Sequence, residues 1–188
     1  HFEGIEAYRV SGTPADCVAL GMHLHENIDL VLSGINIGAN LGNSAWHSGT
    51  LSAARQAVLF GVRGIALSVS VGDGEPEFES LKPFVKAALA ETVHEKDQKL
   101  LNINFPRNPE GEIIWTCQSV RHYDGKVIAN KDPMGRQHYW FTVIPIENVE
   151  KGSDRWAVRQ GKTSITPMIL DLTDKAYLEQ RIADKENN

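Results

Sequence analysis

Two groups of residues in the first third of the chain are of the types that bind ions in proteins. Asn36 and Asn40 offer neutral amide oxygens, which are acceptable ligands for a hard divalent cation such as magnesium or manganese. Ser48, Gly49 and Thr50 offer two hydroxyls and a glycine just before a predicted helix, whose unpaired N–H groups attract an anion. Together these residue types predict one pocket for a divalent metal and a phosphate group.

Each of these signals also has a plainer interpretation. Ser-Gly-Thr before a helix is most often an N-cap, and Asn in a glycine-rich loop is most often there for its backbone tolerance. His47, beside the predicted anion cradle, is either a substrate contact or an exposed loop residue, and the sequence leaves both open. The loop from Gly34 to His47 favours the functional interpretation, because long loops inside compact domains tend to be functional.

A buried strand and a helix must position these residues. Leu30–Leu32 is an apolar run typical of a strand, and Leu51–Phe60 has helical periodicity. In open α/β sheets, ligands bind beyond the carboxyl ends of the strands, where the loop between these two elements lies. The alternation continues and predicts a mostly parallel sheet with right-handed crossovers. Its further elements are a strand at 64–71, a helix at 78–94 and a strand at 100–105.

Two more asparagines, Asn102 and Asn104, alternate with apolar residues in the last of these strands. We expect their side chains to bond neighbouring backbone rather than a ligand, since they stand at the carboxyl end of a strand. From Ile113 onward, strand-like segments replace helices until a C-terminal helix at 174–183. The residues from Asp154 to Gly161 are expected to return the chain toward the core without a helix of their own.

A β-hairpin is predicted around the turn Asp132–Gly135, because strand-like segments flank it on both sides. Tyr139, Trp140 and Phe141 crowd three aromatic rings onto this hairpin. A protruding hairpin with exposed aromatics is typical of a surface that meets a partner. The alternative is that these rings fold back on their own core.

Composition describes an ordinary globular chain of 188 residues, with 41% hydrophobic and 23% charged residues. The net charge of −5 argues against nucleic-acid duplexes and membranes as partners. Cys17 and Cys117 lie in apolar contexts and are expected to be buried free thiols of a reducing compartment. With no apolar stretch of spanning length in the sequence, we expect a cytoplasmic protein.

Several motifs occur in a fixed order along the chain. They are Gly12–Cys17, Ser33–Asn36 with Gly38 and Asn40–Gly42, Ser48–Thr50, Lys126–Ile128 with Asp132–Gly135, and Ser164–Pro167. In this order they resemble the signature of the SurE family, the survival proteins, which are metal-dependent 5′-nucleotidases. The resemblance runs through nearly the whole chain, and an ordered set of motifs is far more specific than any one of them.

The resemblance implies a three-layer, Rossmann-like α/β core with a mostly parallel sheet over residues 1–120. It implies a β-hairpin arm for oligomerisation over 121–150, and C-terminal strands and a helix that pack back on the core over 151–188. Through the arm, the expected assembly is a homodimer or a tetramer.

For function, the resemblance implies hydrolysis of nucleoside 5′-monophosphates to nucleoside and phosphate, with magnesium, manganese or calcium as the cation. It makes Asn36 a metal ligand, and it makes Asn40, Ser48, Gly49 and Thr50 substrate-binding residues. The family pattern begins with a strand ending in Asn-Asp-Asp-Gly, whose paired aspartates hold the metal. This chain contains no Asp-Asp pair, so no catalytic residue is assigned and we expect the chain alone to be inactive.

Two other interpretations stay open. The first is a non-catalytic assembly module of a larger SurE-like protein, contributing mainly the arm and subunit contacts. The second is a nucleotide-binding oxidoreductase domain, suggested by glycines at positions 34, 38 and 42. Their spacing does not give Gly-x-Gly-x-x-Gly in a short turn, which the geometry of a dinucleotide site needs.

Overall fold

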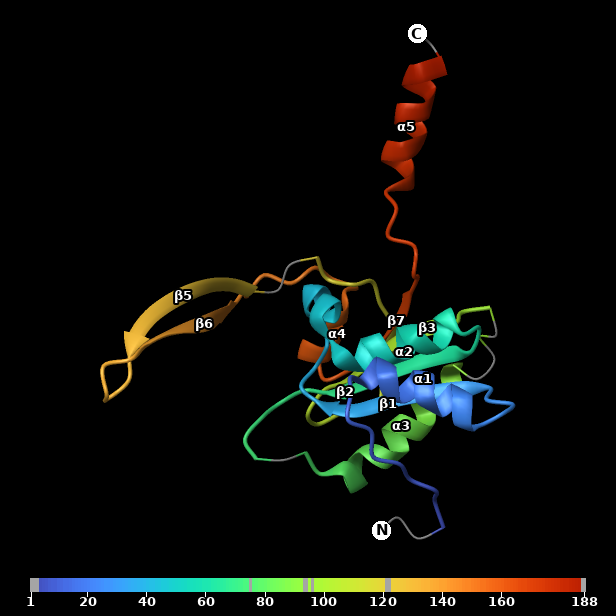
Figure 1. Ribbon diagram of the computed structural model, residues 1–188, viewed down its shortest axis with the longest axis horizontal. Coiled ribbons are helices and arrows are strands. Elements are labelled where there is room, and N and C mark those ends of the chain that lie inside the picture. The colour runs from blue at the N-terminus through green and yellow to red at the C-terminus, as the bar shows by residue number, and fades with distance from the viewer. Residues whose placement is uncertain (1–3, 75, 93–94, 96, 121–122, 187–188) are drawn as a thin grey trace.

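A mostly parallel sheet lies at the centre of the computed structural model (Figure 1). β1 (Leu30–Ile37), β2 (Arg63–Val69) and β3 (Leu100–Phe105) pair in parallel. β7 (Thr163–Met168) pairs antiparallel with β3 and parallel with β4 (Ile113–Trp115), which gives the order β1-β2-β3-β7-β4. The predicted α/β class with a mostly parallel sheet is therefore confirmed.

The structure describes residues 4–74, 76–92, 95, 97–120 and 123–186. Outside this part lie the first three residues of the predicted core segment and the last two positions of the predicted helix 78–94. Positions 121 and 122, where the predicted arm begins, and the last two residues of the chain lie outside it as well.

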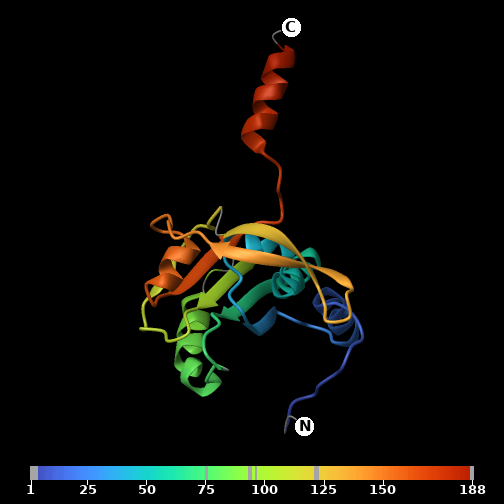
Figure 2. The same cartoon turned by 90° about the vertical axis from the view of Figure 1, so that its left-hand side faces the viewer.

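Helices cover the sheet on both faces, which makes three layers (Figure 2). α3 (Phe78–Thr92) packs on one face, where the apolar side chains of β2 and β3 gather. Those side chains are Ile65, Leu67, Val69, Leu101, Ile103 and Phe105. α2 (Gly49–Leu59) packs on the opposite face against Ala66 and Leu100. That face also carries Ser68, Asn102 and Asn104, all buried, because successive residues of a strand point to opposite sides.

α1 (Pro14–Leu24) packs beside α2, with Thr13 as its N-cap and a proline in its first turn. None of its residues is buried. β1 lies at the edge of the sheet beside β2 and exposes Leu32 and Ile37, so the expectation of a buried strand there is wrong.

β5 (Tyr123–Lys131) and β6 (Gln137–Pro145) form an antiparallel hairpin that stands away from the sheet (Figure 1). The predicted β-hairpin is confirmed. Its turn is held by Asp132, whose Oδ1 accepts hydrogen bonds from the N–H groups of Met134 and Arg136. Trp140 and Phe141 are 61% and 83% exposed, so in this single chain their rings do not fold back on the core.

Two helices differ from the prediction. α4 (Asp154–Arg159) was not expected; it forms because Ser153 caps it, accepting a hydrogen bond from the N–H of Trp156. Six residues are too few for a periodic apolar pattern, so the sequence shows no helical periodicity there. α5 (Lys175–Glu186) was expected against the core, but it projects away from it and its residues 175–185 are exposed (Figure 1).

The expectation of buried cysteines is wrong, since Cys17 and Cys117 are both exposed and unpaired. Cys17 lies on α1, which buries no residue, and the Cys117 thiol lies beside the carbonyl oxygen of Gly152. Among the described residues, no helix is long and apolar enough to cross a membrane.

Candidate functional site

The candidate site is the connection from β1 to α2, which passes through the short 3₁₀ helix η1 (Gly42–His47). Gly34, which the sequence assigns to the loop, lies inside β1 before this connection and has a positive φ of +128°. A Cβ at that position would lie 2.3 Å from the carbonyl oxygen of Leu67, on the neighbouring strand. Only glycine fits, and the close approach keeps the end of β1 against β2.

Asn36 is half-buried, and its side-chain amide is oriented by the loop itself. Its Nδ2 donates a hydrogen bond of 2.7 Å to the carbonyl oxygen of Gly38. A carbonyl oxygen only accepts, so the nitrogen must face it and the amide oxygen must face the other way. Oδ1 makes no hydrogen bond within the described part of the chain, which leaves it as an available oxygen ligand for a cation.

Asn40 is buried beneath the loop, and its N–H and one hydrogen of its side-chain amide donate inside the protein. Its N–H donates to Oδ1 of Asn104 at 2.8 Å, and its Nδ2 donates to Oγ of Ser68 at 2.8 Å. Its carbonyl oxygen accepts from Nδ2 of Asn102 at 2.8 Å and from Nδ2 of Asn104 at 3.3 Å. The prediction that Asn102 and Asn104 bond neighbouring backbone is confirmed.

Ser48 caps α2, as the plainer interpretation of Ser-Gly-Thr expects. Its Oγ accepts a hydrogen bond of 3.1 Å from the N–H of Leu51, so its hydroxyl proton remains free to be donated. The N–H groups of Gly49 and Thr50 meet no acceptor among the residues that the structure describes. Capping and anion binding are therefore compatible here, because the cap uses one acceptor site and leaves three donors.

A second helix begins beside this one. A Cβ on Gly49 would lie 3.2 Å from Cγ of Pro14, the first residue of α1. The positive ends of two helix dipoles thus lie next to each other at Ser48–Thr50. At α1, the hydroxyl and the N–H of Thr13 both donate to Asp16, and they hold the pKa of its carboxyl below the ordinary value. Asp16 is thereby an ionised capping residue.

His47 is exposed, one residue before the cap, and its imidazole makes no hydrogen bond within the described part of the chain. It lines a hollow of about 480 Å³ together with Ser48 and Gly49. Its place beside the cradle is compatible with either role that the sequence leaves open.

The described residues offer a divalent cation one ligand of a site. Nowhere in that part of the chain do three His, Cys, Asp or Glu residues gather closely enough to hold a metal. A single neutral oxygen from Asn36 fits the chemistry of magnesium, manganese or calcium, but these cations need several oxygen ligands. Asn36 therefore fits as one contributor, and no reaction step is derived through the ion.

Sequence reasoning missed the residues that hold the far end of the loop. The N–H of Gly42 donates to Oδ2 of Asp154 at 2.7 Å, and its carbonyl oxygen accepts from Nε2 of Gln118 at 2.7 Å. Both partners lie more than seventy residues away in the sequence, with separations of 112 and 76. The available signal in the sequence was Asp154, in the first turn of α4. It could be used only after that short helix had been recognised.

The profile of one protein family, described as survival protein SurE, matches residues 1–125 of the chain. The chain belongs to the SurE family. Among its relatives is 5′-nucleotidase SurE 1 of Thermus thermophilus, 41% identical over 181 residues, which span 95% of this chain and 72% of that protein. The SurE family relative 5′-nucleotidase SurE of Citrifermentans bemidjiense is 39% identical over 186 residues, 94% of this chain and 74% of its own length.

A solved structure supports the same assignment. The crystal structure of the SurE protein from Aquifex aeolicus superposes with a TM-score of 0.76 at 36% sequence identity. The match covers 90% of this chain and 72% of that one. The α/β arrangement described above is therefore the SurE fold.

Proposed function

We propose that this SurE protein is a phosphatase that hydrolyses nucleoside 5′-monophosphates to nucleoside and phosphate. The observation that carries the proposal is the identity of about 40%, over more than nine-tenths of the chain, to proteins named 5′-nucleotidase SurE. The free donors of Ser48–Thr50 and the free oxygen of Asn36 support it, because they suit a phosphate and a cation on one loop.

In this proposal, Ser48, Gly49 and Thr50 bind the phosphate through the Ser48 hydroxyl and the two N–H groups that begin α2. These donors are fixed before substrate arrives, so they stabilise charge on the phosphoryl oxygens without reorganising. Asn36 contributes its Oδ1 to a divalent cation. When bound, such a cation neutralises phosphoryl charge and lowers the pKa of a bound water.

Asn40 remains a proposed substrate-binding residue with a restricted role. Its N–H and one hydrogen of Nδ2 already donate to Asn104 and Ser68, so the second hydrogen of Nδ2 is the donor left for a phosphate oxygen. Its more immediate role is to hold the loop between Asn36 and Ser48 against the sheet.

The test is phosphate release by the protein expressed from its complete reading frame. Nucleoside 5′-monophosphates are supplied with manganese or magnesium, and the matched 3′-monophosphates serve as controls. We expect hydrolysis of the 5′-esters that stops when the metal is removed with a chelator. Metal-independent hydrolysis, or none, contradicts the proposal. Retention on a nucleotide-dye column without metal, with release by NAD, would instead favour the oxidoreductase alternative.

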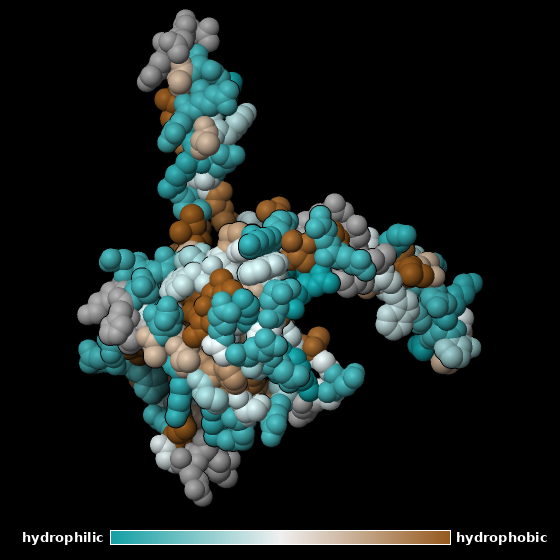
Figure 3. Space-filling model, turned by 180° about the vertical axis from the view of Figure 1, so that it is seen from behind, coloured by the Kyte–Doolittle hydropathy of each residue, from teal (hydrophilic) through white to brown (hydrophobic). Residues whose placement is uncertain are grey.

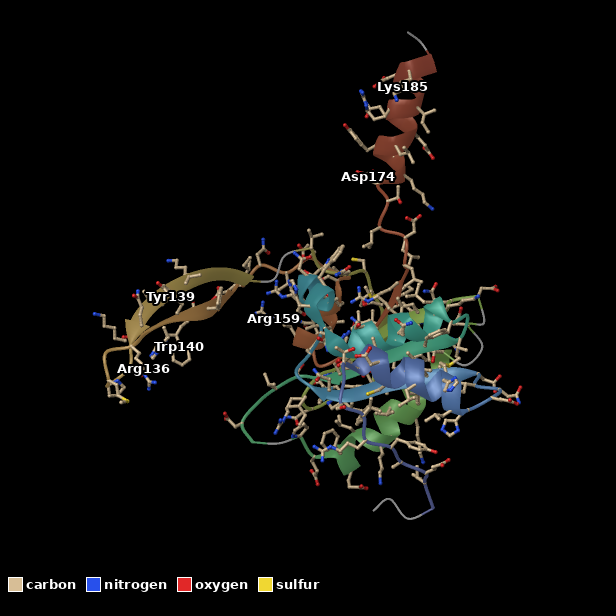
Figure 4. The ribbon with its side chains drawn as sticks, in the orientation of Figure 1. Arg136, Tyr139, Trp140, Arg159, Asp174 and Lys185 are labelled. Carbon is tan, nitrogen blue, oxygen red and sulfur yellow. The ribbon has the colours of Figure 1, made fainter. Side chains whose placement is uncertain are left out.

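We also propose that the hairpin arm joins two or four copies of the chain. The support is the exposure of Trp140 and Phe141 on an antiparallel hairpin that stands clear of the body (Figure 4). The variants Trp140→Ser and Phe141→Ser should lower the molecular mass found by light scattering after size exclusion. Lys131→Ser, also exposed on the hairpin, is the matched control. An unchanged mass in both aromatic variants rules out the arm as the assembly element. A cytoplasmic location stays a prediction.

A further inference from the structure

One buried carboxylate takes no part in the proposed phosphate and metal contacts. It lies between the arm and the site loop, which is the segment between Asn36 and Ser48. Asp154 is the first residue of the short helix α4 and has no exposed surface. Its Oδ2 accepts from the N–H of Gly42 at 2.7 Å. Its Oδ1 accepts from the N–H of Ser119 at 3.0 Å and from the N–H of Arg155 at 2.7 Å. Because buried carboxylates are costly unless fully bonded, these backbone donors explain why the charge is tolerated.

One of these donors belongs to the site loop. Gly42 follows Asn40 by two residues and opens η1, which leads to Ser48. Gln118 holds the carbonyl oxygen of the same residue at 2.7 Å. Gly42 is thus bonded through both its N–H and its C=O to segments of the chain's second half. The position of η1 depends on where those segments lie.

The N–H of Ser119 belongs to the root of the arm, by which we mean the segments just before β5 and just after β6. Ser119 lies shortly before β5, and its hydroxyl donates to Oε2 of Glu150 at 3.1 Å, after the arm has returned. α4 also bonds the returning chain directly, since Arg155 donates to the carbonyl oxygen of Ile146 and Arg159 to that of Glu147. Figure 4 shows Arg159 at the side of the body from which the arm leaves. Both ends of the arm are therefore held by α4 and its immediate neighbours.

We propose that Asp154 is a positioning residue that ties the site loop to the root of the hairpin arm. Its two oxygens bond the two segments separately, so the carboxylate fixes their relative position. A displacement at the root of the arm then reaches Gly42 through α4, and the loop between Asn36 and Ser48 shifts with it. The effect on catalysis rests on the proposed function, whereas the tether itself does not.

The tether is tested by amide hydrogen exchange on the chain without ligand. Asp154→Asn keeps the shape of the side chain but replaces one acceptor by a donor, so it cannot accept from both segments. Exchange of the Gly42 and Ser119 amides should accelerate about tenfold or more, because the loop and the arm root open locally. Ser153→Ala is the matched control, since it removes the cap of the same helix and the bond of the Ser153 hydroxyl to the Glu150 carbonyl but leaves both bonds of Asp154 in place. Equal exchange at Gly42 in the two variants overturns the proposal.

A milder variant keeps the test decisive if Asp154→Asn does not fold. Arg159→Ala removes the hydrogen bond of 2.6 Å to Glu147 and touches nothing in the loop. The proposal expects the Gly42 amide to exchange about threefold faster in this variant, as a local opening of the coupled unit. Arg136→Ala, at the tip of the arm (Figure 4), should leave Gly42 unchanged. No acceleration in Arg159→Ala, or the same acceleration in both variants, contradicts the coupling.

Turnover separates positioning from a loss of folding. In the protein from the complete reading frame, Asp154→Asn should lower kcat for a nucleoside 5′-monophosphate about tenfold while KM changes less than about threefold. Ser153→Ala should leave both constants near those of the wild type. Equal losses of kcat in the two variants would contradict a positioning role. Failure of the wild-type protein to hydrolyse nucleotides would refute the proposed function, while the exchange experiments would still decide on the tether.

Discussion

The N–H of Asn40 donates to Oδ1 of Asn104 at 2.8 Å and joins two residues that lie 64 positions apart. This bond connects the loop after β1 to the carboxyl-terminal half of β3. It is possible because one face of the sheet carries polar side chains in place of the apolar ones that pack against α3. The loop of the candidate site is thus bonded to polar side chains of the sheet through Asn40.

Removing Asn104 should therefore loosen the loop. Asn104→Ala leaves the buried N–H of Asn40 without its acceptor, and such a loss typically costs about 1–3 kcal/mol. We expect that decrease in the free energy of unfolding, measured by urea denaturation, with faster amide exchange at Asn40. Asn102→Ala should cost less, because Asn104 still donates to the carbonyl oxygen of Asn40 that Asn102 bonds, and the substitution also removes an Oδ1 that is buried without a partner. The reverse order of the two costs would contradict this account.

Asn36 should matter for metal and hardly for stability. Asn36→Ala removes a candidate ligand oxygen, and we expect the manganese concentration for half-maximal phosphate release to rise about tenfold or more. Asn36→Asp keeps an oxygen and adds a charge, so it should retain most of the manganese affinity. The comparison needs the complete protein and a titration of activity against metal. Equal affinities in wild type and Asn36→Ala would remove Asn36 from the metal site.

Gly64 sets how closely α2 approaches the sheet. A Cβ there would lie 2.0 Å from the carbonyl oxygen of Ala54, so Gly64→Ala must push the helix away. We expect a loss of stability of about 1–3 kcal/mol from this overpacking. Gly21→Ala is the control, since nothing lies within 4 Å of its Cβ, and on helix α1 it should stabilise by about 0.5–1 kcal/mol. Thermal unfolding distinguishes the two, and a neutral Gly64→Ala would show that α2 can shift freely.

The hairpin turn should weaken in acid. The N–H and the guanidinium of Arg136, with the N–H of Met134, hold the pKa of Asp132 below its ordinary value of 3.8. A depressed pKa means that the turn is stabilised above about pH 4 and loses that support as the pH falls through the lower, folded value. The protection factors of the amides of residues 137–142, which correct exchange rates for the intrinsic effect of pH, should fall over that range in the wild type and not in Asp132→Asn. A pH-independent hairpin in the wild type would contradict this.

Local patterns in the sequence predicted much of the core. The strand at 100–105 has the predicted limits, because its alternating apolar and polar residues are followed at once by a proline. The cap at Ser48 and the turn at Asp132 were also predictable, since each is made by a side chain within a few residues of the backbone it bonds. Such short-range chemistry is visible in one sequence.

Features set by distant residues were not predictable in the same way. Asn40 faces the sheet because Ser68 and Asn104 are there to bond it, and neither lies near it in the sequence. The exposure of Cys17 depends on what covers α1, which the residues of α1 do not specify. α5 carries a few apolar residues, yet it projects from the body. Hydrophobic residues also gather where the chain leaves the body toward α5 (Figure 3), and Ile169 and Leu172 of that stretch are exposed.

The central claim is that the turn from β1 to α2 gathers a cation and a phosphate ester in one pocket. Its most direct test is a crystal structure of the complete protein with manganese and a nucleoside 5′-monophosphate bound. The account predicts manganese at about 2.0–2.4 Å from Oδ1 of Asn36. It also predicts phosphate oxygens on the N–H groups of Gly49 and Thr50 and on the Ser48 hydroxyl. An Asn36 side chain that faces away from the metal, with those three donors bonded only within the protein, would contradict it.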